Sequence, residues 1–101
     1  MKDKGDLACA WLEKADSDLN AARWITEGFG PFDTACFHAQ QAIEKALKAF
    51  LAYNEVPIPR THDLDELQRL CMKYHDSEEI AALDLAQLTD YAVALRYDLE
   101  F

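Results

Sequence analysis

The sequence has few residues that interrupt helices, because only three of its 101 residues are glycine and only three are proline. It also lacks long alternations of valine, isoleucine and threonine, the pattern that is typical of β-strands. Half of the residues are nevertheless apolar, so a chain of this length can bury one core. We therefore predict one all-α domain over residues 1–101.

Basic residues are scarce as well, with ten Lys and Arg against nineteen Asp and Glu and a net charge of −9. Nonspecific attraction to nucleic acid depends on Lys and Arg neutralising phosphates, so any nucleic-acid contact would need a local basic patch. The apolar run from Leu7 to Leu12 is too short for a signal peptide or a membrane span. We expect a cytoplasmic protein without membrane contact.

The three cysteines are odd in number and lack the spacing of a disulfide framework or a zinc site. Cys9 and Cys36 stand among apolar residues, so we expect buried free thiols. No phosphate-binding glycine loop, metal-binding helix motif, hydrolase elbow or dinucleotide fingerprint is found. The 101 residues therefore contain no complete local catalytic motif, and we expect neither a metal nor a cofactor.

The longest run with one clean helical period is residues 37–50. One side is mostly alanine, which favours helix and lets a neighbouring helix approach closely, so we predict the central helix of a bundle. This apolar side consists of Ala35, Ala39, Ala42, Ile43, Ala46, Ala49 and Phe50. The polar side consists of His38, Gln41, Glu44, Lys45 and Lys48. It is either a solvated face with a Glu44–Lys48 pair or a surface for phosphate or an acidic partner.

A first helix is predicted over residues 7–27, where apolar residues recur every three or four positions. Trp24 lies off this stripe, and we expect it to cover the helix end rather than to meet a partner. Residues 28–31 form a short turn. Asp33 is then expected to cap the second helix, with Phe32 and Phe37 packing together as a hydrophobic staple, and this helix runs to about Tyr53.

Two prolines in residues 56–59 end the second helix and stiffen the connection. Arg60 and His62 follow, where either they bind an anion or the turn serves only to cap a third helix through Asp63 and Glu66. The predicted inner stripe of this short helix is Leu64, Leu67, Cys71 and Tyr74. A fourth helix is predicted to begin at Asp76, with apolar positions Ile80, Leu83, Leu88, Tyr91, Ala92 and Leu95. The end of the chain is still apolar, so either the natural chain continues past Phe101 or a partner covers this end.

Three ordered motifs resemble the HEPN domain family: CFHAQQAIEKALKAFL at 36–51, PRTHDL at 59–64 and LTDYAVALRY at 88–97. The resemblance implies an antiparallel up-and-down bundle of four or five helices that usually dimerises. It also implies a partner, because such domains are often encoded beside an MNT-type nucleotidyltransferase as a toxin–antitoxin pair. Toxin and antitoxin roles both remain open for this chain.

Nuclease members of that family carry an arginine followed, after four to six residues, by a histidine. Arg96 matches the arginine, but Phe101 stands at the first possible histidine position and the others fall beyond the chain. We therefore expect a nucleotide- or partner-binding module, with a metal-independent RNase that uses Arg96 and a histidine beyond residue 101 as the alternative. Arg69 and His75 also fit that spacing but lie in the wrong helix. The binding candidates are His38, Gln41, Glu44, Lys45, Lys48, Arg60, His62 and Arg96.

Overall fold

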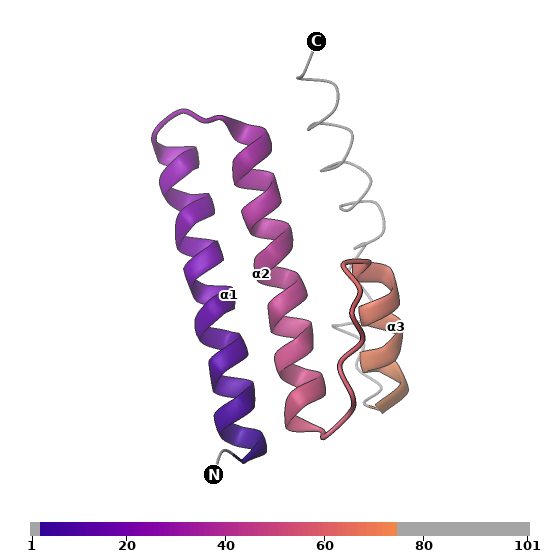
Figure 1. Ribbon diagram of the computed structural model, residues 1–101. Coiled ribbons are helices and arrows are strands. Elements are labelled where there is room, and N and C mark those ends of the chain that lie inside the picture. The colour runs from indigo at the N-terminus through magenta and orange to yellow at the C-terminus, as the bar shows by residue number, and fades with distance from the viewer. Residues whose placement is uncertain (1–2, 75–101) are drawn as a thin grey trace.

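The computed structural model describes residues 3–74, which form three helices and no strand. Helix α1 spans Lys4–Glu27, α2 spans Phe32–Tyr53 and α3 spans Leu64–Tyr74. α1 and α2 form a long antiparallel hairpin, and α3 lies beside the C-terminal half of α2 (Figure 1). The all-α prediction is confirmed for this part of the chain. The predicted fourth helix falls outside the described residues.

α2 is the central helix, as predicted, because it contacts both α1 and α3, whereas these two helices do not contact each other within residues 3–74. α1 and α2 meet along buried alanines that recur every seven residues in each helix. Small side chains at heptad spacing let two helices pack closely with a slight left-handed supercoil. The two rows are Ala8, Ala15 and Ala22 in α1 and Ala35, Ala42 and Ala49 in α2.

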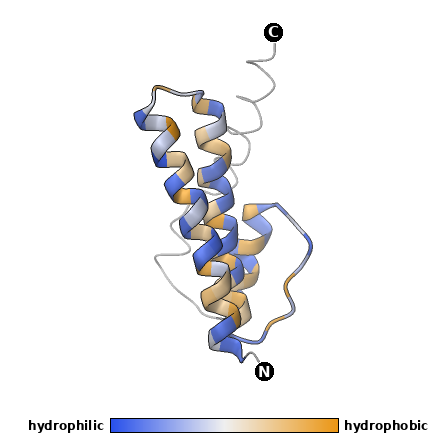
Figure 2. Ribbon diagram, turned by 60° about the vertical axis from the view of Figure 1, so that its left-hand side comes forward, coloured by the Kyte–Doolittle hydropathy of each residue, from blue (hydrophilic) through white to orange (hydrophobic). Residues whose placement is uncertain are grey.

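The leucine-rich core lies on the other side of α2, where α3 and the preceding connection cover it. Leu51, Leu64, Leu67 and Cys71 are fully buried there. The Cys71 thiol donates to the backbone oxygen of Leu47 at 3.6 Å, and burial raises its pKa to about 11. α2 is therefore apolar on two sides, with alanine toward α1 and leucine toward α3, while polar residues recur along the rest of the hairpin (Figure 2).

Of the three helix starts, only that of α3 is capped by the residue predicted from the sequence. Asp3 caps α1 in a capping box with Asp6, so this helix begins three residues earlier than predicted. Asp63 caps α3 as expected, since its carboxylate accepts from the backbone N–H of Asp65. The predicted role of Glu66 is wrong, because its carboxylate accepts from the Thr61 hydroxyl rather than from the backbone of Asp63. The predicted cap at Asp33 is wrong, because α2 begins at Phe32 with Pro31 at the cap position. Phe32 is thus inside the helix and cannot form the predicted staple.

Two expectations about burial are also wrong. Cys9 is exposed rather than buried, because no element among residues 3–74 covers its side of α1. Cys36 is only half-buried, whereas Cys71 is buried as expected. Trp24 does not cover the end of its helix, since it is 73% exposed. Its position is just before a turn that leaves Phe29 90% exposed.

Candidate functional site

Asp18 in α1 is the centre of one group of polar side chains. Its Oδ1 accepts from Nδ1 of His38 at 2.9 Å, and its Oδ2 accepts from the ammonium group of Lys45. All three side chains are partly or largely buried between α1 and α2. Two side chains of the predicted polar side of α2 are therefore held inside the hairpin by a single carboxylate.

The pKa of Asp18 reflects two opposing effects. Burial by itself raises the pKa, but the hydrogen bonds and positive charges of Lys45 and His38 outweigh burial and lower it below its ordinary value of 3.8. The ionised form is therefore favoured by folding. Its stabilisation is present above the pKa of the unfolded chain and is lost as the pH falls through the lower pKa of the folded protein.

Asp18→Asn is accordingly expected to lower the free energy of unfolding by about 1 to 2 kcal/mol at pH 7, because two charge-assisted hydrogen bonds weaken. The difference from the wild type should shrink as the pH falls below 4, because Asp18 is protonated first in the unfolded chain and then, at its lower pKa, in the folded protein. Urea unfolding at pH 7 and at pH 3 measures both effects. Asp16→Asn is the control, since Asp16 is exposed and should change stability little. An equal cost for Asp18→Asn at both pH values would contradict this prediction.

Glu44 in α2 is the centre of a second group. It is only 3% exposed, and its Oε1 accepts from Nδ1 of His62 at 2.9 Å, while its Oε2 accepts from Lys48 at 3.3 Å. A carboxylate can only accept, so the proton on Nδ1 fixes the orientation of the His62 imidazole. That imidazole remains 80% exposed and can bind a ligand through its other nitrogen. The connection to α3 is thus tied to the middle of α2.

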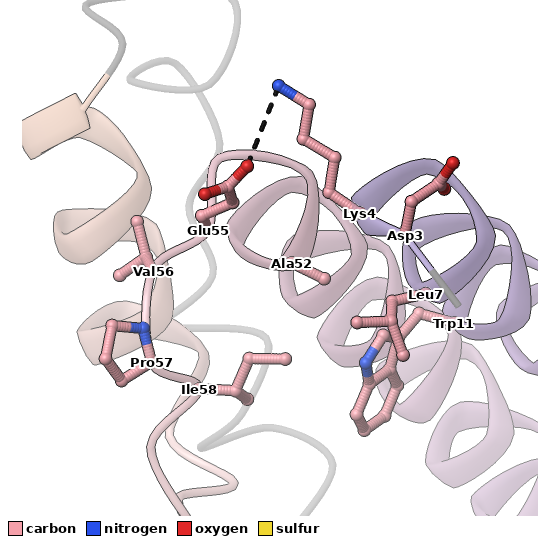
Figure 3. A pocket seen from close by; sticks show the side chains of 9 residues that line it. All are labelled: Asp3, Lys4, Leu7, Trp11, Ala52, Glu55, Val56, Pro57 and Ile58. Carbon is pink, nitrogen blue, oxygen red and sulfur yellow. Dashed lines mark ion pairs between the residues drawn. The ribbon is translucent and has the colours of Figure 1, made fainter. Parts of the chain in front are cut away.

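Trp11 joins this second group to a pocket of about 490 Å³ near the N-terminus of α1. The ammonium group of Lys48 lies 5.6 Å from the centroid of the Trp11 ring, a distance at which a cation–π interaction is favourable. Figure 3 shows the indole opposite Ile58, with the 3.9 Å Lys4–Glu55 ion pair at the pocket's edge. The pocket is mostly apolar and is lined by none of the predicted binding residues, so it is not the predicted polar site.

The predicted binding residues fall into four sets, of which Glu44 and its two partners form one. His38 and Lys45 are engaged by Asp18, and Lys48 and His62 by Glu44. Within residues 3–74, the side chains of Gln41 and Arg60 make no hydrogen bond or ion pair; Gln41 is half-buried and Arg60 is exposed. Arg96 lies outside the described residues. Of the discounted pair, Arg69 bonds to Asp65 at 2.9 Å and His75 lies outside the described residues.

Asp18 and Trp11 were not among the predicted site residues, although both hold cations of α2. A signal for them exists in the sequence. Trp11, Asp18 and Ile25 are spaced by seven, so Asp18 is a carboxylate between two apolar residues of one heptad row. A charged residue at such a position usually has a buried partner on the facing helix. The partner row has the same spacing and contains His38, Lys45 and Ala52.

The described residues contain no group of three His, Cys, Asp or Glu side chains that could hold a metal ion. None of their helices combines the length and the hydropathy needed to cross a bilayer. In comparisons with known proteins, the family model described as the HEPN domain matches residues 8–101. No curated protein and no solved structure matches the chain.

Proposed function

Because this chain belongs to the HEPN domain family, we propose that it is an interaction module, a homodimer that binds an MNT-type nucleotidyltransferase in a toxin–antitoxin-like pair. The proposal depends on one observation in particular. Three large aromatic side chains, Trp24, Phe29 and Phe32, are exposed around the turn between α1 and α2. Exposed aromatic clusters are typical of protein-binding surfaces, where Trp and Phe supply much of the binding energy.

The charges of the hairpin support protein binding over broad contact with a polyanion. Four of the predicted cationic or imidazole side chains are already bonded to Asp18 or Glu44. A surface whose cations are paired within the fold releases few counterions from a nucleic-acid backbone. In this proposal a nucleotide contact is therefore limited to the unpaired side chains of Gln41 and Arg60 and to the exposed ring of His62.

The test is co-expression of the tagged full chain with the MNT-type nucleotidyltransferase encoded next to its gene. We expect the two proteins to copurify, and we expect Trp24→Ala with Phe29→Ala to reduce recovery of the nucleotidyltransferase at least tenfold, because loss of two hot-spot aromatics costs that much affinity. Tyr74→Ala is the matched control, since Tyr74 is an exposed aromatic residue at the far end of α3.

Either of two results would contradict the proposal. One is that the wild-type chain recovers no nucleotidyltransferase, and the other is that no such gene lies beside it. If the double variant copurifies as well as the wild type, the nucleotidyltransferase is still the partner, but the aromatic residues at the turn are not its binding surface. Size-exclusion chromatography with light scattering on the same samples gives the stoichiometry of the complex.

A further inference from the structure

One face of the α1–α2 hairpin carries a continuous apolar groove that no part of residues 3–74 covers. Three hollows of about 390 to 430 Å³ follow one another along it, and adjacent hollows share residues. Leu12 and Ala46 are shared by the middle hollow and the one near the start of α1. Leu19 and Ala39 are shared by the middle hollow and the one near the end of α1. The groove therefore runs nearly the full length of the hairpin.

The walls of the groove have the same repeat as the alanine rows beneath them. On α1 they are Gly5, Leu12, Leu19 and Thr26, each seven residues from the next. On α2, Ala39 and Ala46 show the same spacing. A heptad repeat keeps a seam straight along a supercoiled helix, so it fits another helical surface with that repeat rather than a loop or a sheet.

The size of this face is sufficient for a dimer. The α1 wall from Gly5 to Thr26 is about 32 Å long at 1.5 Å per residue. Two packed helices present a width of about 18 to 20 Å, so the face measures roughly 600 Å² per copy. Two copies would bury about 1,200 Å², which exceeds the roughly 1,000 Å² expected of a specific interface.

We infer that this groove is the self-association surface of the protein, with the α1–α2 hairpin of a second copy packed face to face on the first. The inference deepens the proposed homodimer and rests on it. A second copy fits because a two-fold interface uses the same patch twice, and this patch has both protruding leucines and alanine hollows. Leu12 and Leu19 are about half exposed, so their side chains can enter the hollows of the partner. The result is a four-helix bundle built from two hairpins.

Two native cysteines report on this arrangement without any substitution. Cys9 lines the groove near one end and Cys36 near the other, whereas Cys71, in α3, is buried against α2. If the two-fold axis lies along the helices, Cys9 of one copy comes near Cys9 of the second. If the axis crosses the helices, Cys9 comes near Cys36 of the second copy. Either cross-link supports the inference, and its identity tells which axis is present.

The experiment treats the full wild-type chain with a short bis-maleimide reagent and identifies the linked peptides by mass spectrometry. We expect an intermolecular link through Cys9 and none through Cys71. In parallel, Leu12→Lys with Leu19→Lys should raise the dimer dissociation constant at least tenfold by analytical ultracentrifugation. Leu7→Lys is the matched control, because Leu7 is as exposed as Leu19 but lies outside the groove.

A chain that is monomeric at high micromolar concentration would overturn the inference. So would a dimer that forms no link through Cys9 and is unaffected by lysine at residues 12 and 19. The groove variants should still copurify with the nucleotidyltransferase, since they leave Trp24 and Phe29 intact. Conversely, the variants with Trp24 and Phe29 replaced should still dimerise. The two proposals, self-association through the groove and partner binding through the turn, can therefore be refuted separately.

Discussion

Glu44→Ala is expected to lower the free energy of unfolding by about 3 to 5 kcal/mol, the usual cost of removing one partner from a buried ion pair. Glu44 is only 3% exposed and accepts from both Lys48 and His62. Without it, the Trp11 ring is the one favourable neighbour of the buried Lys48 ammonium group among residues 3–74. The connection before α3 also loses its hydrogen bond to α2.

Urea unfolding followed by circular dichroism measures this cost. The informative control is the double variant Glu44→Leu with Lys48→Met, which removes both charges and fills the space with apolar side chains. It should be close to the wild type in stability, because an apolar pair can replace a buried ion pair without a net penalty. A cost below about 1 kcal/mol for Glu44→Ala would mean that the Glu44–Lys48 pair is as weak as an exposed ion pair, which would contradict this prediction.

Leu67→Ala is expected to cost about 2 to 5 kcal/mol, since Leu67 is fully buried where α3 packs on α2. α3 has only eleven residues and is too short to be a stable helix without this packing. We therefore expect the variant to expose the connection at residues 54–63. Limited proteolysis should cut there faster than in the wild type, while urea unfolding gives the stability change.

Leu7→Ala serves as the control for Leu67→Ala, because Leu7 is 46% exposed and its truncation leaves no closed cavity. It should cost less than about 1 kcal/mol and should leave the proteolysis pattern unchanged. If both leucine variants cost the same, the core at the α2–α3 contact would be far looser than the burial of Leu64, Leu67 and Cys71 indicates.

The helices were predictable because their signals are local. Heptad and helical periods place α1, α2 and three of the four predicted inner residues of α3, and the prolines at residues 57 and 59 end α2 where expected. The fourth, Tyr74, is 51% exposed, so its predicted burial is wrong. The start of α2 was not predictable from capping preference alone. Asp33 is a good cap residue, but the turn lets the helix begin at Phe32, before it. The backbone of Phe29 and Gly30 in this turn has positive φ angles, and such a conformation depends on the whole turn.

The site was harder to predict, because its polar residues are organised by segments far apart in the sequence. A helical projection correctly put Glu44 and Lys48 on one side of α2 and identified their pairing. It could not indicate that the pair would be buried, since α3 and the connection with His62 cover it. The projection also placed Lys45 and His38 on the polar side of α2, but their partner, Asp18, is twenty or more residues away in the sequence. Which cations remain available is therefore a property of the tertiary fold.

The alanine rows of the hairpin limit how its length can change. One residue inserted in α1 would turn every later side chain by about 100°, which would move Asp18 away from Lys45 and replace the following alanines with bulkier neighbours. Whole heptads, added to both helices together, would preserve the packing and lengthen the hairpin by about 10 Å each time. Natural variation in the length of this hairpin should therefore occur in multiples of seven residues per helix.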